Sequence, residues 1–179
     1  MRIISGKWGG RRISPPTNMP HTRPTTDIAK EGLFNILQNR MNFEGIKILD
    51  LFSGTGCISY ELASRGASDL TIIEKDNTMH GFIKKNLEML GAENCKVLKM
   101  DVFAYLNTCT ETFDFIFAGP PYALGSIDEL PKIIVTRQVI NKAGFFVLEH
   151  TPRNQYQKFP GFSFERNYGS TLFSFFVNE

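Results

Sequence analysis

The residues Gly119, Pro120, Pro121 and Tyr122 directly follow the apolar run Phe113–Ala118, which has the composition of a buried strand. Two consecutive prolines fix the backbone and remove its N–H donors, so the carbonyl groups there stay free to accept hydrogen bonds. The tyrosine adds a flat aromatic face. An exocyclic amine of a nucleic-acid base attacks poorly because its lone pair is delocalised into the ring. Acceptors for its N–H groups and an aromatic platform would orient such an amine towards an electrophile, which makes this segment a candidate catalytic site.

A second candidate is the segment Ile48–Cys57, where a buried-type strand runs into a Gly-x-Gly turn at Gly54 and Gly56 and then into a helix. Backbone without side chains can approach a ligand that lies across the carboxyl edge of a sheet. A plain tight turn is the alternative, since Gly-x-Gly by itself is a weak signal. A dinucleotide-dependent oxidoreductase would require a third glycine at the position of Ser59, which counts against that class.

Two acidic residues stand at the ends of the next two expected strands. Glu74 follows Gly56 by 18 residues, a spacing at which nucleotide-binding folds place the carboxylate that accepts hydrogen bonds from ribose hydroxyls. The alternative for Glu74 is a solvated carboxylate. Asp101 has two compatible roles, because it could contact an adenine amino group or cap the helix that follows. Both residues are therefore candidate cofactor ligands.

Cysteine and histidine spacing gives no metal site, since the three cysteines fall in no CxxC or Cys/His pattern: Cys57, Cys95 and Cys109. We expect them to fill core or surface positions in a reduced compartment, and we expect no covalent nucleophile. His21 lies in a basic linker where it could contact phosphate. His80 and His150 are expected to be structural, although the position of His150 at a strand end leaves a pocket role open.

Strand and helix patterns alternate along most of the chain. The first helix is expected to start at Thr26, with an apolar stripe of Ile28, Leu33, Phe34, Ile36 and Leu37. Further helices are expected at 57–65 and 77–90, after 101, and within 126–140. Strands are expected at 46–52, 70–74, 96–100, 113–118, 144–149, 162–168 and 171–177. Strands separated by helices form βαβ units. The sequence therefore predicts an α/β fold with a mostly parallel, doubly wound seven-stranded sheet, helices on both faces, and an antiparallel edge hairpin.

The N-terminal segment differs from the rest in charge. The first 30 residues carry six Lys or Arg and one Asp, a net charge of +5, whereas the remaining 14 basic and 17 acidic residues give −3. Gly9 and Gly10 separate two short extended runs and predict a small hairpin, followed by a proline-rich linker. A basic arm is typical of a partner with a phosphate backbone, and a solvated surface is the alternative. We expect residues 1–25 to form this arm and residues 26–179 to form the main domain.

Composition excludes several other classes. Hydrophobic residues make up 42% and charged residues 21% of the 179 residues, which is typical of a globular chain and not of a disordered one. No apolar run approaches the roughly 18 residues that a membrane span requires, and the N-terminus lacks a secretory signal segment. We therefore expect a cytoplasmic protein with no membrane partner.

Taken together, these motifs resemble class I methyltransferases that use S-adenosylmethionine, and in particular those whose Asp/Asn-Pro-Pro-Tyr/Phe motif serves methylation of base amines. The chain is further similar to the bacterial 16S ribosomal RNA guanine-N2 methyltransferase family (RsmD-like). The resemblance is carried by blocks that reach across almost the whole chain: Met1–Arg11, Arg23–Asp27, Leu49–Gly56, Ser64–Ala67, Ile73–Asp76, Val147–His150 and Tyr168–Gly169.

This resemblance implies a Rossmann-like methyltransferase domain, S-adenosylmethionine as cofactor, and 16S rRNA or an assembling small ribosomal subunit as partner of a monomer. It implies catalysis around Gly119, Pro120, Pro121 and Tyr122. The implied cofactor ligands are Asp50, Phe52, Ser53, Gly54, Gly56, Glu74, Lys75, Asp101 and Val102. The residues expected to bind RNA phosphates are Lys7, Arg11, Arg12 and Arg23. Trp8 would either stack on a base or cover the core.

One residue departs from the pattern, because Gly119 stands where the family has an acidic side chain. Loss of a hydrogen bond to a charged group costs about 1.5 to 3 kcal/mol, roughly ten- to two-hundred-fold in rate. The backbone carbonyls of Gly119 and Pro120, helped by a water or by Glu149, are the remaining acceptors. A second hypothesis is an RNA-binding assembly factor of the same fold in which Gly119 has disabled catalysis.

Overall fold

The computed structural model describes residues 1–19 and 24–178. Within them lie five helices: α1 Asp27–Gln38, α2 Cys57–Ser64, α3 Asn77–Leu90, α4 Val102–Thr108 and α5 Glu129–Thr136. Seven strands complete the fold: β1 Lys47–Leu51, β2 Asp69–Glu74, β3 Cys95–Lys99, β4 Phe113–Ala118, β5 Ile140–His150, β6 Phe162–Tyr168 and β7 Thr171–Val177. The predicted order of elements is confirmed.

All seven strands form one sheet in the order β3-β2-β1-β4-β5-β7-β6. The first five of these strands run parallel, whereas β7 pairs antiparallel with both β5 and β6. The predicted edge hairpin is therefore present, with its second strand inserted next to β5. Because β1, β2, β4 and β5 are parallel, their carboxyl ends meet at one edge of the sheet, and the polar residues after them are brought together there.

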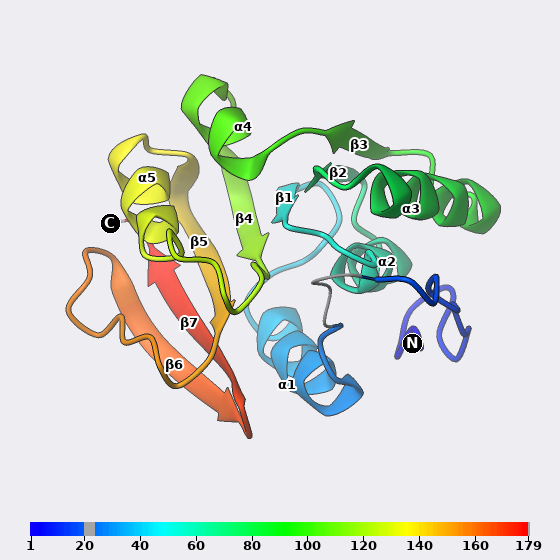
Figure 1. Cartoon of the computed structure of the whole chain (residues 1–179), viewed down its shortest axis with the longest axis horizontal. Coiled ribbons are helices and arrows are strands. Elements are labelled where there is room, and N and C mark those ends of the chain that lie inside the picture. The colour runs from blue at the N-terminus through cyan, green and yellow to red at the C-terminus, as the bar shows by residue number, and fades with distance from the viewer. Residues whose placement is uncertain (20–23, 179) are drawn as a thin grey trace.

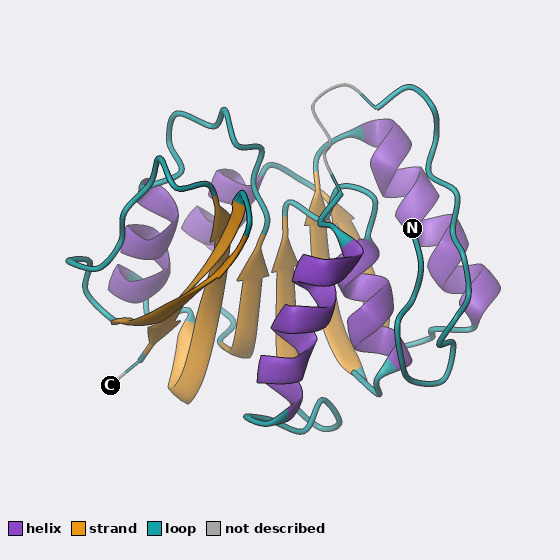
Figure 2. Ribbon diagram, turned by 90° about the horizontal axis from the view of Figure 1, so that it is seen from below, coloured by secondary structure: helices purple, strands orange, loops and turns teal. Residues whose placement is uncertain are grey.

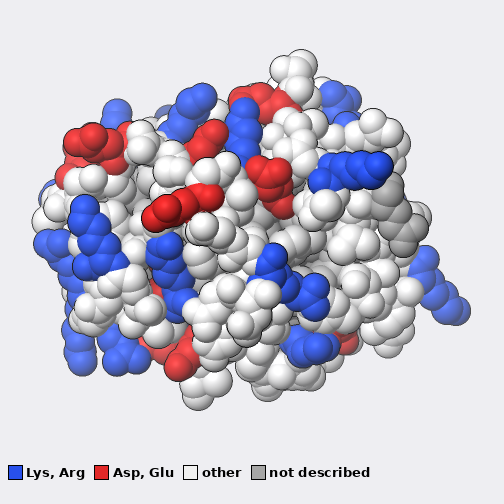
Figure 3. Space-filling view, turned by 180° about the vertical axis from the view of Figure 1, so that it is seen from behind, with Lys and Arg blue, Asp and Glu red and all other residues white. Residues whose placement is uncertain are grey.

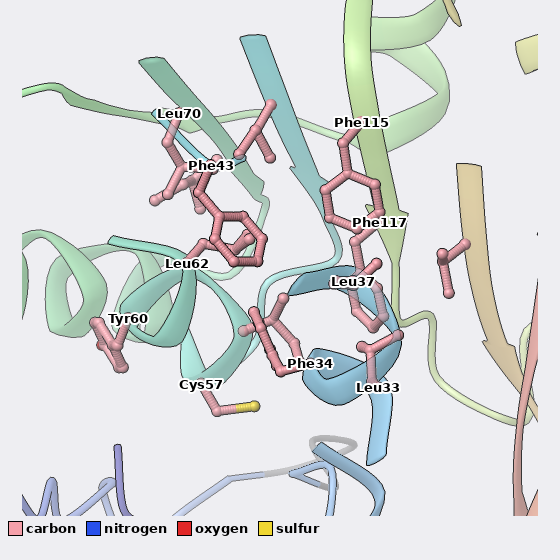
Figure 4. Packing of buried hydrophobic residues seen from close by; sticks show 14 of the residues in the cluster. Leu33, Phe34, Leu37, Phe43, Cys57, Tyr60, Leu62, Leu70, Phe115 and Phe117 are labelled. Atoms are coloured by element: carbon pink, nitrogen blue, oxygen red, sulfur yellow. The ribbon is translucent and has the colours of Figure 1, made fainter. Parts of the chain in front are cut away.

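Helices cover both faces of the sheet, as Figures 1 and 2 show. On one face, α1, α2 and α3 bury apolar side chains against β1, β2 and β4; Figure 4 shows Phe34 and Leu37 of α1 near Leu62 of α2 and Phe115 of β4. On the other face, α4 and α5 pack through Leu106, Leu130 and Ile134. Alternate side chains of the central strands pack into the two cores, which explains why those strands are apolar on both faces.

Short polar side chains determine where three of the helices begin. Thr26 accepts a hydrogen bond from the Ala29 N–H at 3.2 Å and begins α1. Asp76 caps α3 by accepting from Met79 N–H at 2.9 Å. Asp101 caps α4 by accepting from Ala104 N–H at 3.0 Å. These oxygens satisfy N–H groups that have no partner within the helix, so each helix begins at a defined point after its strand.

The buried face of helix α1 differs from the predicted apolar stripe at one residue. The buried side is formed by Ala29, Leu33, Phe34 and Leu37, whereas Ile28 is 76% exposed. Successive helix residues are rotated by about 100°, so Ile28 points away from a face centred on Leu33. The prediction that Ile28 belongs to the apolar stripe was wrong. Ile36 is partly buried at the margin of the core.

The N-terminal segment forms a hairpin that lies against α2. A single bridge pairs Arg2 with Arg12, and Ile3 and Ile13 are buried in the main core. Trp8 is partly buried against the same core, and its backbone N–H donates to Ser64 Oγ at 3.0 Å. The arm is therefore attached to the body by its apolar side chains.

A buried carboxylate completes this attachment. Glu61 of α2 is fully buried and accepts hydrogen bonds from the N–H groups of Ile4 at 2.8 Å and Ser5 at 3.1 Å. The same carboxylate pairs with Arg65 at 2.9 Å and with the buried Lys30 at 3.7 Å. The Lys30 ammonium also donates to the carbonyl of Arg2 at 2.6 Å. One carboxylate thus joins the arm, α1 and α2.

In the part of the chain that the structure describes, none of the helices is both long enough and apolar enough to cross a bilayer.

Candidate active site

A pocket of about 580 Å³ opens at the carboxyl edge of the parallel strands. The candidate catalytic residues Gly119, Pro120, Pro121 and Tyr122 all line it. The implied cofactor ligands that line it are Asp50, Phe52, Ser53, Gly54, Glu74, Lys75 and Val102. The fold therefore brings the two sequence motifs, which are far apart along the chain, into the wall of one cavity.

The Gly-x-Gly loop leaves β1 through a strained backbone. Phe52 has a φ of 58°, and Gly54 and Gly56 have φ of 56° and 83°. Only glycine adopts this region without cost, and a non-glycine residue there is typical of a functional constraint. A side chain at Gly56 would also come within 2.7 Å of the Tyr60 ring. Gly56 itself is not part of the described pocket wall and acts by turning the chain into α2.

Glu74 holds this loop in place. Its Oε2 accepts a hydrogen bond from Gly54 N–H at 2.7 Å, and its Oε1 accepts from Asp76 N–H at 2.9 Å. Each carboxylate oxygen has a second acceptor position. A carboxylate fixed in this way at the end of β2 can accept further hydrogen bonds from a pair of hydroxyl groups in the pocket.

Asp50 is a buried carboxylate at the base of the pocket. Ser59 Oγ donates to its Oδ2, whereas Oδ1 has no hydrogen-bond partner among the described residues. Burial raises the pKa of Asp50 to about 7, and the hydrogen bonds from Ser59 and Ser53 partly oppose this. An unpaired buried carboxylate oxygen is costly unless a ligand supplies a donor or a positive charge.

This pKa makes a testable prediction about stability. Because the folded pKa of Asp50, about 7, lies above its unfolded value of 3.8, the folded state holds the proton more tightly. The contribution of protonated Asp50 to the stability of the folded state is therefore fully present below about pH 4 and is lost as the pH rises to about 7. Asp50→Asn cannot titrate. Between pH 5 and 7 the unfolding free energy of the wild type should fall by about 2 kcal/mol more than that of the variant. Parallel urea-unfolding profiles across that range would contradict the assignment.

Two described candidates, Asp101 and His150, do not line the pocket. Asp101 is exposed and caps α4, and it does not belong to the described pocket wall, whereas its neighbours Met100 and Val102 do. Arg23 and His21 lie outside the described residues. His150 is buried, with hydrogen bonds to the Thr151 carbonyl at 2.8 Å and to Ser174 Oγ at 2.7 Å. These contacts fit the structural role expected for His150.

The pocket also contains Thr25 and Cys57, which were not predicted to line it, and Glu149, which was expected to help hold the amine. Thr25 precedes α1 and reaches across to Glu149 of β5, with 2.7 Å between Thr25 Oγ1 and Glu149 Oε2. Tyr122 OH donates to the other carboxylate oxygen of Glu149 at 2.9 Å. Cys57 lines the same pocket, and burial raises the pKa of its thiol. A thiol whose pKa is raised is a poor nucleophile.

The comparisons with known proteins agree with this geometry. The family model described as "Conserved hypothetical protein 95" matches residues 1–177. The chain belongs to this family. "Ribosomal RNA small subunit methyltransferase D" of Escherichia coli K12 is 35% identical over 134 residues, which cover 75% of this chain and 66% of that relative. The protein of the same name from Buchnera aphidicola (Acyrthosiphon pisum) is 32% identical over 148 residues, 82% of this chain and 76% of that relative. The expected RsmD-like relationship is confirmed.

Solved structures share this fold over most or all of the chain. A hypothetical protein of Thermus thermophilus superposes with a TM-score of 0.85 at 25% identity and covers 100% of this chain and 99% of that chain. The 16S rRNA N2 methyltransferase RsmC of T. thermophilus, in complex with AdoMet and guanosine, gives a TM-score of 0.69 at 25% identity over 87% of this chain and 44% of that chain. The predicted Rossmann-like class I methyltransferase fold is confirmed.

Proposed function

We propose that this chain transfers a methyl group from S-adenosylmethionine to the exocyclic N2 amine of a guanine in 16S rRNA. The observation that carries this proposal is the pocket whose wall is shared by the Gly54 loop, Glu74 and the Pro120–Tyr122 segment. The first two suit a nucleoside cofactor, and the third suits a flat base with an amine. The names of the relatives from E. coli and B. aphidicola, and the guanosine in the RsmC complex, support the same substrate class.

The residues present fit this cofactor. S-Adenosylmethionine carries two positive groups, an ammonium and a sulfonium, and one carboxylate. The pocket is lined by the carboxylates of Asp50, Glu74, Asp76 and Glu149 and by the ammonium of Lys75. The unpaired Oδ1 of Asp50 provides a position at which a cationic or N–H group would be stabilised. Glu74 would hold the ribose hydroxyls, while Phe52 and Val102 would contact the adenine.

The chemistry requires little from the protein beyond positioning. The bound cofactor supplies a methyl carbon whose bond to sulfur breaks with the electron pair remaining on sulfur. The chain would hold the base so that its amine nitrogen lies about 3 to 3.5 Å from that carbon, and such positioning lowers the barrier to transfer. Carbonyl groups of Gly119 and Pro120 would accept from the amine, and the Tyr122 ring would support the base. The target must leave its stack, which is least costly in RNA loops and bulges.

We further propose that residues 1–25 act as the RNA-binding arm of the domain formed by residues 26–179. Lys7, Arg11 and Arg12 are exposed in the described part of the arm, whereas Ile3 and Ile13 face the core. Figure 3 shows one face of the molecule, where Lys and Arg side chains are interspersed with Asp and Glu and are densest at the lower left. An arm fixed by its apolar side and basic on the other presents its cations to phosphates.

The charge of the arm predicts a steep salt dependence of RNA binding. Replacing Arg11 and Arg12 by Ala removes two phosphate contacts, and each contact contributes about 0.7 to 0.9 to the slope of log K against log salt. The double variant should therefore lower that slope by about 1.5 in filter binding with 16S RNA. Lys142→Ala with Arg153→Ala, at exposed positions of the body, is the matched control. Equal slopes in the wild type and the arm variant would show that Arg11 and Arg12 do not contact RNA phosphates.

The transfer itself is tested with radiolabelled S-adenosylmethionine and two substrates from cells that lack this enzyme: naked 16S RNA and 30S particles. Label in either RNA supports the proposal and identifies the substrate form. Cofactor binding without label in either substrate would favour a non-catalytic assembly factor instead.

A further inference from the structure

Gly119, in the candidate catalytic segment, lies beside the Phe117 ring and beside another carboxylate, that of Glu149. A Cβ atom at Gly119 would lie 3.6 Å from Glu149 Oε2 and 3.1 Å from the Phe117 ring. Strands β4 and β5 are neighbours in register, with Ala118 opposite Leu148. Residues 119 and 149 therefore follow the same pair on adjacent strands, and a side chain from either position reaches the same part of the pocket.

The orientation of Glu149 is fixed from two other segments. The residue is only 4% exposed, yet it lines the pocket. Its Oε2 accepts from Thr25 Oγ1 at 2.7 Å and its Oε1 accepts from Tyr122 OH at 2.9 Å. Each of these oxygens retains a second acceptor position. Two hydroxyl donors thus hold the carboxylate rigidly without using up its capacity to accept.

Within the part of the chain that the structure describes, Glu149 has no positively charged partner. Burial raises its pKa, and the hydrogen bonds from Thr25 and Tyr122 oppose that rise by stabilising the ionised form. A buried carboxylate with neutral donors only is stabilised further by an N–H group that becomes positive during a reaction.

We propose that Glu149 is the residue that accepts the N–H of the target amine, in place of the acidic side chain absent at position 119. This proposal rests on the proposed function and adds a catalytic residue to it. Thr25 and Tyr122 act on the amine through Glu149 as positioning residues, because their hydroxyl groups fix the carboxylate.

The proton and electron balance of the step is simple. The lone pair of N2 forms the new bond to the methyl carbon, and the carbon–sulfur bond breaks with its electron pair on sulfur. The amine nitrogen then carries the positive charge that the sulfur has lost. One N2 proton passes to Glu149 and from there to water, which leaves a neutral methylated amine and an ionised Glu149.

The first test combines three variants: Glu149→Gln, Gly119→Asp, and both together. Glu149→Gln should lower kcat by about 10- to 200-fold, the range for loss of a hydrogen bond to a charged group, with affinity for S-adenosylhomocysteine unchanged. Gly119→Asp alone should not raise turnover, since it places a second carboxylate beside the first. The kcat of the double variant should be at least about tenfold higher than that of Glu149→Gln. A purely structural role for Glu149 would not produce this recovery.

The matched control is Glu165→Gln. Glu165 lies on β6 of the same sheet and also accepts from a hydroxyl, Ser174 Oγ, at 3.2 Å, but it is not in the described pocket wall. Its variant should keep wild-type turnover. Turnover of Glu149→Gln within about twofold of the wild type would overturn the proposal, because the expected loss is at least about tenfold.

A second measurement uses the folded wild type and needs no methyl transfer. Inosine differs from guanosine only by lacking the N2 amine. With S-adenosylhomocysteine present, the wild type should bind guanosine at least about tenfold more tightly than inosine in a titration followed by calorimetry or NMR, and Glu149→Gln should lose the difference. Equal affinities in the wild type would contradict the role of Glu149.

The two measurements separate this proposal from the proposed function. Guanosine preference that depends on Glu149, without methylation of rRNA, would reject the function and retain the recognition role. Methylation of guanine N2 by the wild type and by Glu149→Gln at equal rates would retain the function and reject the role of Glu149.

Discussion

Glu74→Ala is expected to weaken binding of S-adenosylmethionine by at least about 100-fold. The carboxylate would accept from two ribose hydroxyls, and each hydrogen bond to a charged group contributes about 1.5 to 3 kcal/mol. The same carboxylate holds the Gly54 N–H at 2.7 Å, so its removal would also loosen the loop that is proposed to contact the cofactor. Both losses act on the same ligand, which is why this variant has the largest expected effect on affinity.

The measurement is calorimetric titration with S-adenosylhomocysteine, the stable product. Glu88→Ala is the control, because Glu88 is an exposed carboxylate on α3 outside the pocket. This variant should bind S-adenosylhomocysteine with the affinity of the wild type. Far-UV circular dichroism confirms that each variant is folded. A folded Glu74→Ala protein that binds within about threefold of the wild type would show that Glu74 does not hold the ribose, since even one such hydrogen bond is worth roughly tenfold.

Glu61→Gln is expected to lower the unfolding free energy by about 3 to 5 kcal/mol. Removing one partner of a buried ion pair leaves the other charge without compensation. Here the remaining charges are Lys30, which is 1% exposed, and Arg65. The N–H groups of Ile4 and Ser5 also lose a charged acceptor. The arm should therefore detach from α2 more readily.

Urea unfolding measures the first effect, and the rate of trypsin cleavage after Arg11 and Arg12 measures the second. Glu129→Gln is the matched control, because the Glu129–Lys132 pair is exposed at 54% on both side chains and should change stability by less than about 0.5 kcal/mol. Equal unfolding midpoints for the two variants would mean that Glu61 contributes no more than a surface pair.

Local sequence patterns predicted the fold and, in the pocket wall, Gly54, Glu74 and the Gly119–Tyr122 segment, whereas the family resemblance implied Asp50, Phe52, Ser53, Lys75 and Val102. Strand β1 is apolar on both faces because it lies in the middle of the sheet, and the Gly-x-Gly turn follows it directly. Parallel pairing then brings Glu74 and the residues from Gly119 to Tyr122 to the same edge without further information. Glu74 ends β2 and the Gly119–Tyr122 segment follows β4, so their positions depend on topology alone.

The residues that sequence reasoning did not place depend on contacts between distant segments. Thr25 meets Glu149 across 124 positions of the chain, and Glu61 meets the arm across 57. Nothing in the local pattern around Thr25 distinguishes it from the adjacent helix cap Thr26. Asp101 stands at a strand end as Glu74 does, but its carboxylate turns to the N–H of Ala104. The structure shows the capping role of Asp101, which is one of its two compatible roles expected from the sequence.

The central claim is tested most directly by identifying the methylated nucleoside. The protein is incubated with isotope-labelled S-adenosylmethionine and 30S particles from cells that lack it, the 16S RNA is digested, and the nucleosides are separated and identified by mass spectrometry. We expect the label in N2-methylguanosine, at one guanine of the RNA. Label in any other nucleoside, or bound cofactor with no labelled nucleoside in either 30S particles or naked 16S RNA, would contradict the proposed function.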